Sequence, residues 1–96
     1  MLAKTPIVVD RIPKEEIRRQ ALRVAIIAEL DAISLYEQLA AMVEDESRRR
    51  VLLSIAREEK IHVGELLELL LRVDEDQGRC LESGREEARE IIEGEH

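Results

Sequence analysis

Apolar residues recur every three or four positions along two long stretches of the chain. The first repeat follows Pro13 and continues to about Val43, and the second continues from about Ser47 to Leu71. This spacing places apolar side chains on one face of an α-helix. Between the stretches, the run Glu44-Asp45-Glu46-Ser47 breaks the period with acids and a hydroxyl, which are typical of a helix N-terminus. The pattern predicts two long helices joined by a tight turn, an antiparallel hairpin.

The rest of the chain is predicted to form an arm and a short third helix. Residues 1–12 show no helical period and are predicted as an extended N-terminal arm. The polar stretch 74–78 predicts a loop, and Ser83 with Glu86 three residues later fits a capping box that would start the third helix. The expected organisation is the arm followed by one all-α domain over residues 13–96.

The composition excludes several classes of protein. The chain has 96 residues with no Trp or Phe and one Tyr, so its core is aliphatic and thin, and association would thicken it. The net charge of −7 includes no basic stripe, which argues against a nucleic-acid partner. Cys80 is the only cysteine, and no apolar run approaches the ~20 residues of a membrane span. These features predict a cytoplasmic protein without a membrane partner.

Ligand-type side chains interrupt both apolar stripes near their middles. Glu29 interrupts the first stripe, and Glu59 with His62, an E-x-x-H spacing, interrupts the second. In an antiparallel hairpin, residues equidistant from the turn lie at the same height, and the midpoint of positions 29 and 60 falls in the turn. The three side chains are therefore expected to converge. An unpartnered carboxylate in an apolar seam costs several kcal/mol, and a divalent metal removes that cost.

The number of these residues predicts a site shared between two chains. Di-iron carboxylate bundles use a Glu from each of two helices and a Glu-x-x-His from each of the other two, and this chain carries one of each. Two copies related by a two-fold axis would complete the set, with two irons per pair. Spacing does not decide whether Glu29 or Glu59 bridges the metals, although the helix that Glu59 shares with His62 favours Glu59. Tyr36, one heptad after Glu29, is either a packing aromatic or a hydrogen-bond donor to a ligating carboxylate.

Two segments carry a resemblance to a known family. They are Ala-Glu-Leu-Asp-Ala-Ile-Ser-Leu-Tyr-Glu-Gln over 28–38 and Ala-Arg-Glu-Glu-Lys-Ile-His over 56–62, and the likeness extends over about 15–73. The chain resembles the encapsulated ferritin family. The resemblance implies a hairpin with a small C-terminal helix, a decameric ring of dimers, and a ferroxidase centre at the dimer interface. It assigns Glu29, Glu59 and His62 as iron ligands and places Tyr36 beside them as part of the catalytic set.

The same resemblance implies the reaction and the setting. Fe(II) would be oxidised to Fe(III) with oxygen, inside an encapsulin shell that stores the mineral. Ala28 and Leu35 depart from the acid and Trp that members often carry near metal access, and Asp31 is the one matching acid. No shell-targeting tail follows Glu90, so either the domain is normally fused to a shell protein or its packaging differs.

Two other functions remain open at this point. A rubrerythrin-like di-iron peroxidase would use the same carboxylate cage, but the chain lacks rubredoxin-type cysteine pairs. A structural hairpin that drives oligomerisation without metal is the second alternative. It leaves three ligand-type residues in the apolar stripes without an explanation and predicts metal-free protein.

Overall fold

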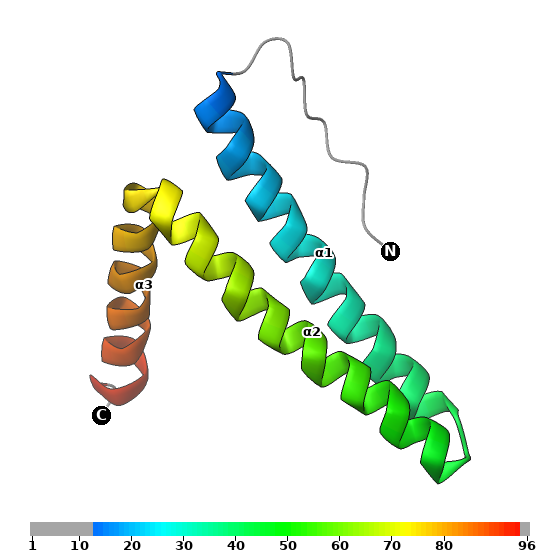
Figure 1. The fold of residues 1–96 in the computed structure, drawn as a ribbon. Helices are drawn as coiled ribbons and strands as arrows, with labels where there is room; N and C mark the ends of the chain where they lie inside the picture. The colour runs from blue at the N-terminus through cyan, green and yellow to red at the C-terminus, as the bar shows by residue number, and fades with distance from the viewer. Residues whose placement is uncertain (1–12, 95–96) are drawn as a thin grey trace.

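The computed structural model describes residues 13–94, which form three helices and no strand (Figure 1). The helices are α1 (Lys14–Met42), α2 (Glu46–Val73) and α3 (Glu75–Gly94). The prediction of an all-α antiparallel hairpin followed by a C-terminal helix is confirmed, with α1 and α2 within two residues of their expected bounds. The predicted N-terminal arm, 1–12, lies outside the described residues.

The acidic turn starts α2, as its composition predicts. A carboxylate oxygen of Asp45 accepts a hydrogen bond from the backbone N–H of Arg48 at 3.1 Å and another from the Ser47 hydroxyl at 2.8 Å. Asp45 is therefore the N-cap residue of α2, and Glu46 adds a negative charge in the first turn, where the helix dipole favours it. Three residues, 43–45, reverse the chain.

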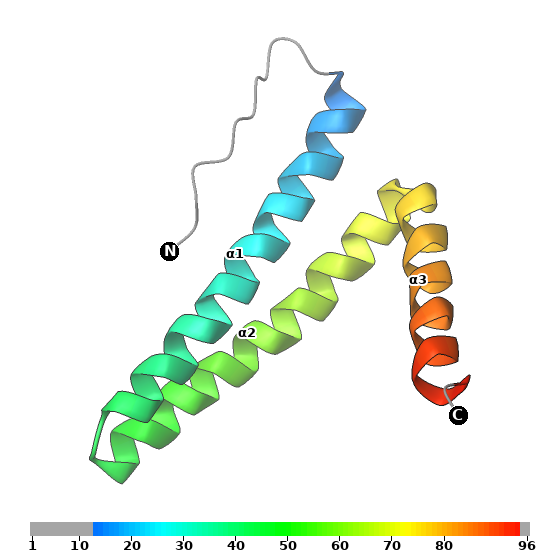
Figure 2. The same cartoon turned by 180° about the vertical axis from the view of Figure 1, so that it is seen from behind.

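The hairpin helices pack most closely near this turn. Ala40 of α1 is 2% exposed and Ala56 of α2 is 1% exposed, and side chains this small let two helix backbones approach each other. With distance from the turn the two helices diverge, as Figures 1 and 2 show from opposite sides. Leu70 is the third apolar residue that is buried among residues 13–94. The thin core expected from the composition is confirmed.

The third helix begins earlier than predicted. The expected loop over 74–78 and the expected capping box at Ser83 are both wrong, because α3 starts at Glu75 and Ser83 lies inside it. Asp74 caps α3 instead, accepting the backbone N–H of Gln77 at 3.0 Å. An Asp cap and an acidic first turn outweigh the roughly 1 kcal/mol that a glycine such as Gly78 costs a helix. Cys80 is an exposed residue of α3.

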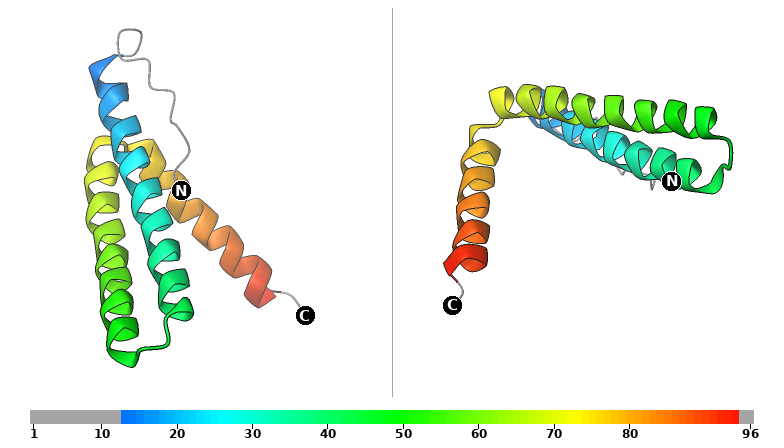
Figure 3. Two further views of the ribbon diagram at one scale, coloured as in Figure 1. Left: turned by 90° about the vertical axis from the view of Figure 1, so that its right-hand side faces the viewer. Right: turned by 90° about the horizontal axis from the view of Figure 1, so that it is seen from below.

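The third helix turns sharply away from the hairpin and touches it only near the junction (Figure 3). None of its 20 residues is buried, and Ile91 and Ile92 near its end are 64% and 75% exposed. Asp74 is the one residue between α2 and α3. No helix within residues 13–94 is long and apolar enough to cross a membrane.

Candidate metal centre

Glu29, Glu59 and His62 meet between α1 and α2. Each offers one ligand atom, and these atoms lie within 4.8 Å of one another. The Nδ1 atom of His62 is 3.3 Å from a carboxylate oxygen of Glu29 and 3.5 Å from one of Glu59. The convergence expected from distances along the chain to the turn is therefore present in the structure.

The helical spacing explains how the three side chains come together. Residues three apart on a helix are surface neighbours, so Glu59 and His62 present a carboxylate and an imidazole to the same side of α2. The antiparallel hairpin then brings Glu29 from α1 to their level, a separation of 33 residues along the chain. The ring nitrogen of His62 lies between two carboxylates, either donating to them or, after losing its proton, offering a lone pair to a metal.

The burial of this group is incomplete. The side chains of Glu59 and Glu29 are 20% and 24% exposed, and that of His62 is 45% exposed. Two carboxylates this close together repel each other, and partial burial strengthens the repulsion by reducing solvent screening. A cation or a protonated imidazole is the charge that balances them. The exposed side of the group leaves room for additional ligands from outside this chain.

The donor set fits iron. Two hard carboxylate oxygens and one imidazole nitrogen are the donors that non-haem iron takes in proteins, and the set includes no soft thiolate. Adjacent ligands of one octahedral ion, each about 2.1 Å from it, are roughly 3 Å apart. The separations of 3.3 and 3.5 Å between His62 Nδ1 and the two carboxylate oxygens are close to that value. Small side-chain rotations would therefore let His62 share an ion with Glu29 or with Glu59.

Tyr36 is less closely engaged. It follows Glu29 by two turns on α1 and is half-buried, but within residues 13–94 its hydroxyl makes no hydrogen bond to the three ligand-type groups. Glu58 and Glu65, which flank the group on α2, are exposed. Asp31, on α1, is half-buried and does not join the group of possible ligands in the described part of the chain.

An ion pair that the sequence reasoning missed joins the two helices beside this group. The ammonium of Lys60 lies 2.9 Å from a carboxylate oxygen of Glu37, and the two side chains are 58% and 46% exposed. Lys60 follows Glu59 and Glu37 follows Tyr36, so the pair ties together the backbones next to two candidate site residues. Glu37 is much closer to the turn along the chain than Lys60, so the equidistance that predicts the metal group gave no signal for this pair.

The hairpin and its carboxylate–imidazole group define a helical protein of the ferritin-like class. The model of the EncFtn-like family matches residues 6–85. The chain belongs to that family, the encapsulated ferritins, and the resemblance noted in the sequence is confirmed.

Two proteins of known description are similar to it. One is a ferritin-like-encapsulin shell fusion protein of Pyrococcus furiosus, 51% identical over 94 residues, which are 95% of this chain. This chain covers 27% of that relative's length. The other is the crystal structure of an encapsulated ferritin domain from Pyrococcus furiosus, which superposes with a TM-score of 0.81 at 49% identity and covers 95% of each chain.

Proposed function

We propose that this chain is a ferroxidase that oxidises Fe(II) to Fe(III) with oxygen. The observation that carries the proposal is the convergence of Glu29, Glu59 and His62 between α1 and α2 in a chain of the encapsulated ferritin family. A structural hairpin would have no use for two facing carboxylates and an imidazole at this level. Fe(II) is the substrate, and each ion that is oxidised gives one electron to oxygen.

The site is proposed to be complete only when two chains pair. One chain supplies two carboxylates and one imidazole, which is half of the four Glu and two His of a di-iron bundle. Two copies around a two-fold axis supply the whole set, since each surface patch then faces its own copy. Large apolar side chains on the hairpin also stand exposed, among them Ile27, Leu30 and Ile61 at 49%, 51% and 54%. A facing copy would cover such residues.

Each side chain has a distinct part in this proposal. Glu29 and Glu59 bind the incoming Fe(II) and lower the cost of the higher charge on Fe(III), because anionic oxygens favour the harder ion. His62 supplies a neutral nitrogen and fixes the height of the ions along the hairpin. Tyr36 is assigned a positioning role. After the ions enter, its hydroxyl donates a hydrogen bond that orients a ligating carboxylate. Either Glu29 or Glu59 bridges the two ions.

An encapsulin shell is proposed as the partner of this chain. The 51% identical relative joins a ferritin-like part to an encapsulin shell in one protein. An iron-oxidising domain next to a shell wall would deliver Fe(III) into the enclosed space. The proposed location of the chain is the interior of that compartment, in the cytoplasm, as a homo-oligomer for which the ring of five dimers is the expected form.

The experiment is anaerobic addition of Fe(II) to metal-free protein, followed by air. We expect ferric absorbance to rise well above the buffer rate, with about one iron bound per chain, as the proposed stoichiometry of two per pair requires. His62→Ala and Glu59→Gln should abolish this rise, whereas Glu58→Gln, an exposed neighbour on the same helix, should leave it unchanged. Helix content from circular dichroism should be the same in all four proteins.

Three outcomes distinguish the alternatives. Retained oxidation in both His62→Ala and Glu59→Gln would reject the assigned site. Absence of oxidation and of bound iron in the wild-type protein would favour the structural hairpin. Faster turnover of hydrogen peroxide than of oxygen at the same site would favour a peroxidase. Mass measured before and after metal addition tests pairing, because an ion that binds only the assembled state stabilises it.

A further inference from the structure

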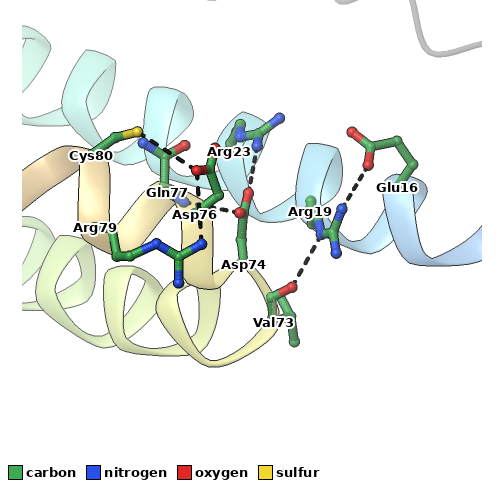
Figure 4. Close-up of polar contacts among 9 residues, drawn as sticks. All are labelled: Glu16, Arg19, Arg23, Val73, Asp74, Asp76, Gln77, Arg79 and Cys80. Atoms are coloured by element: carbon green, nitrogen blue, oxygen red, sulfur yellow. Dashed lines mark hydrogen bonds and ion pairs between the residues drawn. The ribbon is translucent and has the colours of Figure 1, made fainter.

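The junction between α2 and α3 is held by one buried carboxylate. The side chain of Asp74 is 8% exposed, and both of its oxygens are engaged. Oδ1 accepts the backbone N–H of Gln77 at 3.0 Å and so caps α3, while Oδ2 accepts a hydrogen bond from the guanidinium of Arg23, on α1, at 2.6 Å (Figure 4). One residue therefore touches all three helices, because it also follows the last residue of α2.

A second arginine ties α1 to the same junction. The Nε atom of Arg19 donates to the backbone carbonyl of Val73, the last residue of α2, at 3.1 Å, and its Nη1 atom lies 2.9 Å from a carboxylate oxygen of Glu16. Arg19 and Arg23 are four residues apart, so they project from the same face of α1. Both side chains extend from α1 toward the junction, as Figure 4 shows.

Little else joins α3 to the hairpin. None of its residues is buried, and its contacts with α2 are confined to the junction. Most of the stability of a helix in a protein comes from tertiary packing, and its direction relative to a neighbouring helix is set only by what it packs against or bonds to. Here the cap residue is also the ion-pair partner of α1. The bonds that start α3 and the bond that anchors it to α1 therefore share one carboxylate.

We propose that the Asp74–Arg23 pair is a clamp that fixes the direction of α3 relative to the hairpin. Capping alone would stabilise α3 but leave it free to pivot through changes in the backbone dihedral angles φ and ψ of residue 74. The bond to Arg23 adds a second point of attachment on another helix, which removes that rotation. The Nε atom of Arg23 is buried and has no hydrogen-bond partner within residues 13–94. In this part of the chain the guanidinium is therefore held in place by its hydrogen bond to Asp74.

The charges near Asp74 support an ionised clamp. The hydrogen bond from the Gln77 backbone, followed by the Arg23 and Arg19 guanidinium groups, lowers the pKa of Asp74 below its ordinary value of 3.8 against the opposing effect of burial. The carboxylate is therefore charged throughout the neutral range. The pair is mostly shielded on the Asp74 side, where screening by salt is weakest.

Capping and clamping can be separated by substitution. Asn caps helices as well as Asp does, so Asp74→Asn keeps the cap and removes the charge that holds Arg23. Arg23→Met leaves the cap untouched, keeps most of the aliphatic stem and removes the clamp from the other side. Asp76→Asn is the matched control, because its carboxylate belongs to an exposed residue of α3 whose partners, Arg79 and the Cys80 thiol, both lie on α3 itself at 3.9 Å.

The direction of α3 is measured by the distance between two spin labels. The labels are placed at Ser54→Cys on α2 and Glu90→Cys on α3, both exposed positions, in a Cys80→Ser background. Labelled protein is diluted with unlabelled protein so that the two labels of one chain are observed. We expect a narrow distance distribution in the otherwise unmodified protein and in Asp76→Asn, and a broadened and displaced distribution in Asp74→Asn and Arg23→Met.

Circular dichroism separates pivoting from unfolding. Helix content should be unchanged in Arg23→Met, so a broad distribution there reports motion of an intact α3. If Asp74→Asn and Arg23→Met both keep the narrow distribution, the clamp is rejected and contacts other than the Asp74–Arg23 bond set the direction of α3. If α3 unfolds in Asp74→Asn, the distance distribution of Arg23→Met still tests the clamp, because the cap of α3 is intact in that variant. None of these outcomes depends on iron, so the clamp and the proposed ferroxidase stand or fall separately.

Discussion

The two ends of the hairpin are held together in different ways. Near the turn, Ala40 and Ala56 are almost fully buried, and their small side chains let the helices approach each other. At the opposite end the helices have diverged, and Arg19 and Arg23 bridge them with bonds to Val73 and Asp74. The turn forces the first pair of segments together, so small apolar side chains suffice there. The open end has no such covalent tie and depends on long side chains with directional bonds.

The two ends nevertheless share one kind of hydrogen bond. Each hairpin helix ends on a backbone carbonyl that accepts a hydrogen bond from an arginine of the other helix. Val43, after α1, is bonded by Arg49 of α2 at 3.1 Å, and Val73, at the end of α2, is bonded by Arg19 of α1 at the same distance. The partial negative charge at a helix C-terminus favours a cation there. Both bonds join the helices at their ends, in the register that brings Glu29 to the level of Glu59.

The largest effect is expected from breaking the close packing near the turn. Ala56→Leu would force a larger side chain into a place where the native one is 1% exposed, and overpacking of this kind costs about 1 to 3 kcal/mol. The free energy of unfolding in urea, measured on metal-free protein at one fixed concentration, checks this. Ala41→Leu, at an exposed position of α1, is the control and should change the stability by less than about 0.5 kcal/mol. Equal stability of the two variants would contradict close packing of α1 and α2 at Ala56.

A smaller effect is expected at the open end. Arg19→Met removes the bond to the Val73 carbonyl and the pair with Glu16, and the loss should be roughly 0.5 to 1.5 kcal/mol because the arginine is partly exposed. Arg18→Met is the matched control, since Arg18 is 66% exposed and its pair with Glu15 spans 3.5 Å, so a change near zero is expected. The same urea titration measures both variants. A loss in Arg18→Met as large as in Arg19→Met would show that general charge, not the bond to α2, stabilises this end.

The smallest effect is expected from acid at the junction. Asp74 has a lowered pKa in the folded chain, so its ionised form contributes stability above the ordinary value of 3.8, and that contribution is lost as the pH falls through the lower folded value. The comparison is between the wild type and Asp74→Asn, because the other carboxylates titrate in both. We expect the thermal midpoint of the wild type to exceed that of the variant near neutral pH, with the difference shrinking below about pH 4. A difference that does not change with pH would exclude a role for the charge.

The sequence predicted the hairpin more reliably than the junction after it. The period of apolar residues and the acids of the turn locate α1, α2 and their reversal, since burial and capping act locally on those residues. Asp74 was missed because a polar run containing Gly78 has the composition of a loop. Its capping of α3 is local, but its burial depends on Arg23, 51 residues earlier in the chain. A local pattern carries no signal for a partner at that distance.

The candidate site followed from the same hairpin geometry. Glu29 and the Glu59–His62 pair were expected to meet because they are equidistant from the turn, and the structure brings their ligand atoms within 4.8 Å. The Lys60–Glu37 pair was not predicted, because its residues are not equidistant from the turn and an exposed pair does not interrupt an apolar stripe. For Tyr36, spacing fixes the face of α1 on which the ring lies but not the direction of its hydroxyl.

Because a single residue connects α2 and α3, a small rotation at that residue moves the far end of the third helix by a large distance. Twenty residues at 1.5 Å each extend about 30 Å, so a rotation of about 10° at residue 74 displaces the far end by about 5 Å. Such a displacement equals one helical turn, enough to shift Ile91 and Ile92 out of register with any surface that they meet. The precision of contacts made at the far end of α3 is therefore decided at Asp74, more than 15 residues away from them.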